Sequence, residues 1–135
     1  PQGASRLHGA RIRGLDPESP ILEGMKALRW GWGCEVTAAT SIGGAKSVLR
    51  HLDDDPDAIL ADYHLDNEVT GLMALDALGE RLTGAVPGIV ITADRTEEVA
   101  EEVRRGGYQL LLKPVRPAAL RALLTRTLQA SQAPQ

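Results

Sequence analysis

Three short apolar segments of the chain each end in a polar residue. Segment 58–61 ends in Asp62, segment 88–91 in Thr92 and segment 110–112 in Lys113. Short segments that are apolar throughout are typical of strands buried on both faces of a parallel sheet. Because parallel strands end at the same edge, we expect a carboxylate, a hydroxyl and an ammonium group together there, where open α/β folds place their chemistry.

These groups suit the transfer of a phosphoryl group. The carboxylate of Asp62 could act as the nucleophile and form an aspartyl-phosphate. Such a transfer needs a divalent cation and donors that meet the charge of the transferring group. Mg²⁺ takes one or two carboxylates with water and substrate oxygens, and Asp16 and Glu18 follow the first predicted strand. Lys113 offers a compact charge to a phosphoryl oxygen, and Thr92 offers a hydroxyl donor.

Each of these residues alone also has a purely structural explanation. A lone Asp or Thr at the end of a strand usually caps a turn or a helix, and a lone Lys there is usually solvated. The joint pattern favours a site, because three polar residues close three strands in one series of strand–helix units.

The predicted elements alternate strand and helix five times. Strands are expected near 10–15, 35–38, 58–61, 88–91 and 110–112, and helices near 20–30, 42–52, 70–82, 96–105 and 117–128. This order implies a parallel sheet with right-handed crossovers and helices on both faces. It favours a flavodoxin-like (βα)5 three-layer sandwich with a five-stranded parallel sheet in the order 2-1-3-4-5, because a barrel needs eight units. Asp16, Asp62, Thr92 and Lys113 would then converge on one crevice.

Length and composition predict one domain with an aliphatic core, since the 135-residue chain contains no Phe. We expect this domain at 10–129, a linker or tail at 1–9 and a disordered tail at 130–135. The net charge of −3 argues against nucleic acid or an anionic membrane as a partner. No segment approaches the ~20 apolar residues of a membrane span, and no signal peptide is visible, so a cytoplasmic protein is expected. Cys34 is expected to be a small buried hydrophobe.

The three strand ends resemble those of the receiver domains of two-component response regulators. The matching segments are 59–62, 89–93 and 110–114, and the resemblance extends over residues 10–128. The segments that follow Asp62 and Lys113 are most similar to receivers at the C-terminus of hybrid sensor histidine kinases. The resemblance implies a signalling module, not an enzyme, which accepts a phosphoryl group on Asp62 from a phosphohistidine of a histidine kinase or phosphotransfer protein. It also implies a cis peptide bond between Lys113 and Pro114.

The resemblance implies a Mg²⁺ site as well. Its ligands would be two acidic residues after the first strand, the carboxylate of Asp62 and the main-chain carbonyl of His64. Asp16 matches the first acid, but Pro17 stands at the position of the second, which is the direct metal ligand. Glu18 could reach the cation only from one position later, so we predict weak binding of Mg²⁺.

A second departure concerns the residues that respond to phosphorylation. Many receivers carry an aromatic residue three positions before the lysine, where this chain has Leu110. The resemblance therefore places the response on Thr92, Leu110 and the helix at 96–105, whose firm apolar residues are Val99 and Val103.

Two other functions stay in competition at this point. Pro17 favours a degenerate receiver that binds a partner without phosphorylation. A small α/β phosphatase with an aspartyl intermediate is disfavoured, because such enzymes typically need a second acid two residues after the nucleophile, where this chain has His64. The sequence also leaves a homodimer open.

Overall fold

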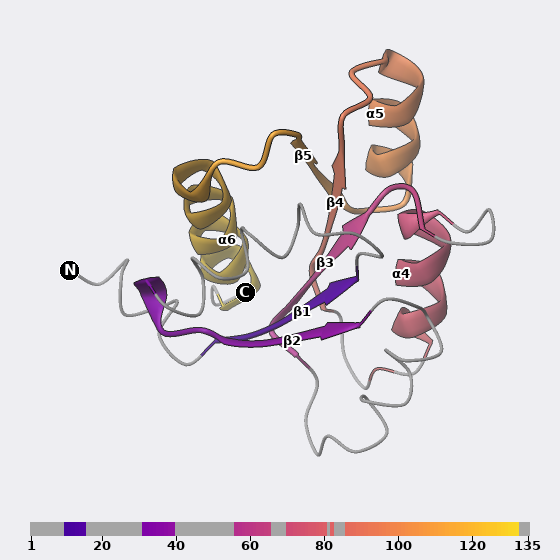
Figure 1. The fold of residues 1–135 in the computed structure, drawn as a ribbon. Coiled ribbons are helices and arrows are strands. Elements are labelled where there is room, and N and C mark those ends of the chain that lie inside the picture. Colours follow the sequence, from indigo (N-terminus) through magenta and orange to yellow (C-terminus); the bar gives the residue numbers. More distant parts are fainter. Residues whose placement is uncertain are drawn as a thin grey trace.

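A parallel sheet lies at the centre of the described part of the chain (Figure 1). The computed structural model describes residues 10–15, 31–39, 56–65, 70–80, 82 and 86–132. Within them the strands are β1 (Arg11–Leu15), β2 (Glu35–Ala39), β3 (Ala58–Asp62), β4 (Gly88–Thr92) and β5 (Gln109–Leu112). Their order is β2-β1-β3-β4-β5, and every neighbouring pair is parallel. The predicted parallel α/β class is confirmed.

β3 and β4 form the buried centre of this sheet. Every residue of both strands is buried, as expected of segments without polar alternation. Leu60 and Ile91 contribute to the core on one face, whereas Ala61 and Val90 contribute to the core on the other. Apolar side chains on both faces require helices on both sides.

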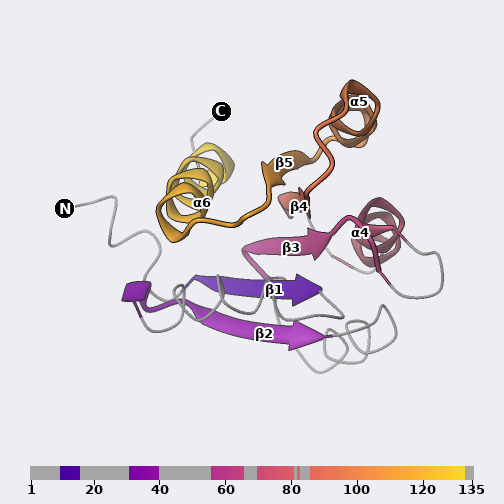
Figure 2. The same cartoon turned by 45° about the horizontal axis from the view of Figure 1, so that its top comes forward.

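Helices supply that cover on either side of the sheet (Figure 2). α4 (Gly71–Gly79) and α5 (Glu97–Arg105) pack on one face, and α6 (Pro117–Gln132) packs on the other. Threonine begins both α4 and α5. The hydroxyl of Thr70 accepts a hydrogen bond from the N–H of Met73 at 3.2 Å, and that of Thr96 accepts one from Val99 at 3.4 Å. These N-caps satisfy helix donors that would otherwise lack a partner.

The last helix extends further than the sequence predicts. Its apolar stripe ends at Leu128, yet α6 continues to Gln132. The expected disordered tail is therefore wrong for residues 130–132, because Ala and Gln favour a helix and no proline lies between Pro117 and Pro134. Residues 133–135 lie outside the described part of the chain.

Two other helix ends differ from the predictions. α4 ends at Gly79 and not near Leu82, since glycine is a poor helix former. Gly31 and Trp32 are still helical, and the left-handed residue Gly33, with φ of 73°, follows them. Residues 1–9, the rest of that predicted helix and the predicted helix at 42–52 lie outside the described residues.

Cys34 is buried in the core beneath α6, as predicted. Burial, and to a lesser extent the charge of Asp57, raises the pKa of its thiol to about 11. Trp32 packs against the same core, and the guanidinium carbon of Arg121 on α6 lies 5.7 Å from the centre of its ring. With its raised pKa, the Cys34 thiol stays protonated at neutral pH, as expected of a residue whose role is core packing.

The ring of Tyr108 fixes the approach to β5. A Cβ atom at Gly88 would lie 2.7 Å from the Cδ1 atom of this ring, and one at Gly106 would lie 2.8 Å from Cδ2. The hydroxyl donates a hydrogen bond to Asp76 on α4, and burial together with this bond raises the pKa of Tyr108. The sequence places Tyr108 two residues before Leu110, and the structure gives it a packing role between two glycines.

Candidate functional site

The carboxylate of Asp62 and the ammonium group of Lys113 form an ion pair where β3 and β5 end. The Nζ atom of Lys113 lies 2.7 Å from Oδ2 of Asp62. The side chain of Asp62 is 8% exposed and that of Lys113 is 25% exposed. Such a pair is less screened by solvent than a surface pair. The structure thus brings together two of the predicted site residues.

The main chain that follows Asp62 is held from two sides. The N–H of Tyr63 donates to the carbonyl of Ile91 on β4 at 2.8 Å, and the carbonyl of Tyr63 accepts from the N–H of Gly71 on α4 at 2.8 Å. The N–H of His64 donates to Oδ1 of Asp62 at 3.0 Å. These bonds fix where the carboxylate sits and how it is turned.

Gly71 is a site residue that the sequence reasoning missed. A Cβ atom at this position would lie 2.4 Å from the carbonyl oxygen of Asp62. Only a glycine lets the first turn of α4 approach the end of β3 so closely. The available signal was its position directly after the N-cap Thr70, because glycine is otherwise unfavourable in a helix.

Thr92 ends β4 beside this ion pair and is buried. Its hydroxyl oxygen accepts a hydrogen bond from the N–H of Asp94 at 3.1 Å, and its carbonyl accepts one from the N–H of Lys113 at 2.9 Å. The register places Asp62 opposite Ile91, one residue before Thr92. The hydroxyl proton of Thr92 is not used in that bond, so it remains a potential donor.

Asp94 was also missed by the sequence reasoning. Its Oδ1 accepts a hydrogen bond from the N–H of Thr96 at 2.9 Å. This bond, with a smaller effect of His64, lowers the pKa of the Asp94 carboxyl. An Asp two residues before a helix cap is a common turn signal, so Asp94 shapes the loop between β4 and α5.

Comparison with known proteins gives this geometry a family. The family model of the response regulator receiver domain matches residues 15–125. The chain belongs to that family. As a receiver domain it is a phosphoacceptor module of two-component signalling.

Curated relatives and solved structures agree with this assignment. Two-component response regulator ORR24 of Oryza sativa subsp. indica is 27% identical over 116 residues, which are 85% of this chain and 18% of that protein. ARR14 of Arabidopsis thaliana is 28% identical over 114 residues, which are 84% of this chain and 29% of that protein. The chain thus spans less than a third of the length of these relatives.

Two solved receiver domains share the fold. The CheY-like receiver of Methanospirillum hungatei JF-1 has a TM-score of 0.77 at 21% identity and covers 92% of this chain and 97% of its own. The receiver of the Francisella response regulator 1452 has a TM-score of 0.76 at 18% identity and covers 92% and 100%. At such identities the likeness concerns the fold alone.

The predicted response residues of this receiver domain lie on the α4–α5 face. Leu110 is half-buried opposite Val90 and packs against the same core as Val99 and Val103. These two valines are the buried residues of α5. The helix is therefore attached by a thin apolar stripe, as predicted.

Receiver domains bind Mg²⁺ at the acidic phosphorylation site, and Asp62 fits such a role. Each of its oxygens accepts one hydrogen bond, from His64 or Lys113, which leaves lone pairs for a cation. Asp16, Pro17 and Glu18 lie outside the described residues, so the other predicted ligands remain predictions.

Metal-binding clusters and membrane-spanning helices are both absent from the described part of the chain. It contains no group of three or more side chains that could hold a metal ion. None of its helices is long and apolar enough to cross a membrane. The side chain of His64 is exposed, and its main chain forms an isolated β-bridge with Thr70. The structure therefore gives no support to its imidazole as a metal ligand.

Proposed function

We propose that Asp62 is the phosphoacceptor of this receiver domain. One observation carries the proposal: Asp62 is a buried carboxylate at the end of a central strand and is paired with Lys113 at 2.7 Å. The donor would be a phosphohistidine of a histidine kinase or of a phosphotransfer protein.

The proposed transfer makes one bond and breaks one. A carboxylate oxygen of Asp62 attacks phosphorus, the bond between phosphorus and the donor's imidazole nitrogen breaks, and that nitrogen keeps the electron pair. Lys113 then holds an oxygen of the transferred group, and Thr92 turns its hydroxyl to donate to another. A bound Mg²⁺, held by Asp62, the carbonyl of His64, Asp16 and Glu18, would supply positive charge to the developing negative oxygens.

Replacing Lys113 by Ala should slow phosphoryl uptake while the fold survives. Loss of one positive donor from such a site costs about a hundredfold in rate. The cost in stability should stay below about 2 kcal/mol, because Asp62 keeps its bond from His64 and is the last residue of β3. Acetyl phosphate uptake followed by mass spectrometry, together with urea unfolding, measures both effects.

Arg116→Ala provides the matched control for this experiment. Arg116 is an exposed cation three residues after Lys113, and its removal should change neither rate nor stability. A Lys113→Ala variant that loses several kcal/mol but takes up phosphate at the normal rate would show that the lysine serves the fold.

Mg²⁺ should bind the free domain weakly, in the millimolar range. Pro17 removes a carboxylate, and fewer negative ligands mean less attraction to offset the reluctance of Mg²⁺ to lose water. Titration followed by amide shifts around Asp62 measures the affinity, and Pro17→Asp should tighten it by about tenfold. A micromolar site that Asp16→Ala abolishes would show that Glu18 has replaced the missing ligand.

We place the response to phosphorylation on α5, β5 and α6. Thr92 would move toward the phosphoryl group. α5 would follow, because Val99 and Val103 are the only residues of this helix that are buried. Leu110 has no hydroxyl that could exchange partners. The two states should then differ by about 1 kcal/mol, so the inactive form remains populated after phosphorylation.

A second proposal concerns the protein that contains this domain. We take the chain to be the receiver of a hybrid sensor histidine kinase, working in the cytoplasm. Support comes from the similarity of segments 61–65 and 113–120 to such receivers. The alternative of a degenerate receiver finds no support in the family comparison.

A further inference from the structure

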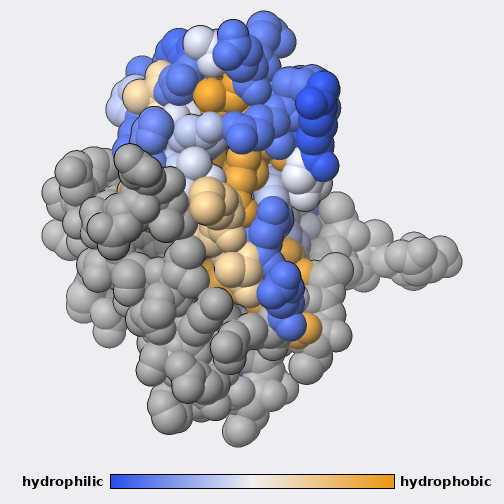
Figure 3. Space-filling view, turned by 90° about the vertical axis from the view of Figure 1, so that its right-hand side faces the viewer, coloured by the Kyte–Doolittle hydropathy of each residue, from blue (hydrophilic) through white to orange (hydrophobic). Residues whose placement is uncertain are grey.

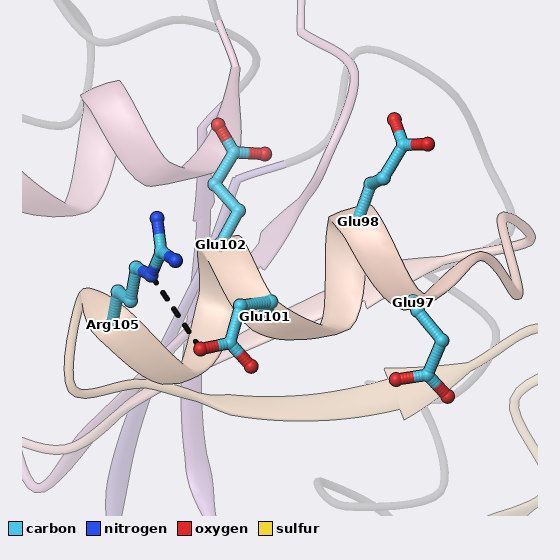
Figure 4. Close-up of a pocket in the computed structure, with 5 residues that line it drawn as sticks. All are labelled: Glu97, Glu98, Glu101, Glu102 and Arg105. Atoms are coloured by element: carbon cyan, nitrogen blue, oxygen red, sulfur yellow. Dashed lines mark ion pairs between the residues drawn. The ribbon is translucent and has the colours of Figure 1, made fainter.

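Tyr63 connects the end of β3 to α5. Its hydroxyl donates a hydrogen bond to Oε1 of Glu102 at 2.5 Å. Glu102 points to the same side of α5 as Glu98, away from the ion pair between Glu101 and Arg105 (Figure 4). The residue that directly follows the proposed phosphoacceptor thus contacts a helix that begins beyond β4.

Hydrogen bonds on both sides hold the main chain of Tyr63 in place. Its main-chain groups bond to Ile91 on β4 and to Gly71 on α4, each at 2.8 Å. The ring packs against the α4–α5 core and lies edge-on to the ring of His64 at 4.9 Å. The position of the hydroxyl is therefore set by the end of β3.

The apolar contact between α5 and the rest of the domain is small. The face that it presents is largely hydrophilic (Figure 3), and its buried residues are Val99 and Val103. Within the described residues no other side-chain hydrogen bond joins α5 to another element. A charge-assisted bond from a phenol to a carboxylate is stronger than a neutral one.

We infer that the Tyr63–Glu102 hydrogen bond is a latch that holds α5 in the unphosphorylated domain and that phosphorylation of Asp62 weakens it. The second half of this inference rests on the proposed function of Asp62. A phosphoryl group brings close to two negative charges next to Tyr63. Glu102 lies at the far end of the phenol, and the carboxylate of Asp94 lies near enough to act on the same ring. Repulsion among these groups favours displacement of Glu102, and with it α5.

The donor of the latch is the phenol of Tyr63, which is not ionised near neutral pH. The bond to Glu102, followed by burial, raises the pKa of Tyr63 to about 12. The phenol therefore remains a protonated donor at every pH well below that value.

Amide hydrogen exchange in the whole chain tests the latch. Tyr63→Phe removes only the hydroxyl and should raise exchange in α5 by about tenfold without any phosphoryl group. Tyr108→Phe is the matched control, because its hydroxyl bonds to Asp76 on α4 and not to α5. It should leave exchange in α5 unchanged. Beryllofluoride with Mg²⁺, a phosphoryl mimic, should raise exchange in the unaltered protein but add little in Tyr63→Phe.

Glu102→Gln separates repulsion from simple packing. Its amide oxygen can still accept the hydrogen bond but carries no charge, so α5 should stay in place and respond less to beryllofluoride. Unchanged exchange in Tyr63→Phe overturns the latch even if Asp62 is phosphorylated. A protein that takes up no beryllofluoride contradicts the proposed function and the second half of the inference. The comparison without the mimic then still decides whether the bond holds α5.

Discussion

Replacing Asp62 by Asn is expected to abolish phosphoryl uptake. The amide has nearly the same shape as the carboxylate but no nucleophilic oxygen, so the fold remains and the chemistry stops. With acetyl phosphate and Mg²⁺ the unaltered chain should gain one phosphoryl group that survives acid and is lost in base. The variant should gain none, which corresponds to a rate at least about a hundredfold lower. Mass spectrometry of the intact protein measures both.

Asp57→Asn is a suitable control for this experiment. Asp57 lies just before the other end of the same strand, where its Oδ2 accepts a hydrogen bond from the main-chain N–H of Arg11 at 2.7 Å. An Asn at position 57 can still accept that bond. The change lies at the opposite end of β3 from the ion pair of Asp62 and Lys113, so uptake should be normal. Undiminished uptake by the Asp62→Asn variant would overturn the assignment and direct the search to another residue.

The ends of β3, β4 and β5 could be predicted because the signal is local. Each is a short apolar segment closed by a polar residue, and the geometry of a parallel sheet does the rest. The pairing of Asp62 with Lys113 across 51 residues of sequence confirms that reasoning. The predicted ligands Asp16 and Glu18 lie outside the described residues and stay predictions.

Contacts between distant side chains could not be predicted in the same way. The bond from Tyr63 to Glu102 spans 39 residues, and that from Tyr108 to Asp76 spans 32. Hydrophobic periodicity shows which face of an element is buried, but not which side chains meet across two elements. The end of α6 was predicted wrongly for another reason: the helix continues to Gln132, past the end of its apolar stripe at Leu128.

Gly71→Ala should destabilise the domain, whereas Gly79→Ala should stabilise it. Both glycines belong to α4, so the two variants gain the same helix preference of alanine over glycine. They differ in the room that surrounds each glycine for a Cβ atom. The Cβ atom at Gly71 would meet the carbonyl oxygen of Asp62 at 2.4 Å and the carbonyl carbon at 3.1 Å, whereas a Cβ atom at Gly79 would meet nothing within 4 Å.

The atoms that Gly71→Ala would strike are main chain and cannot rotate away. Either the first turn of α4 or the end of β3 must move, and overpacking of this kind costs about 1–3 kcal/mol. Gly79→Ala should gain about 0.5 kcal/mol, because alanine loses less conformational entropy on folding. Urea unfolding should therefore shift in opposite directions. Displacement of Asp62 should also slow phosphoryl uptake in Gly71→Ala alone, and equal midpoints with normal uptake would show that α4 and β3 tolerate a side chain between them.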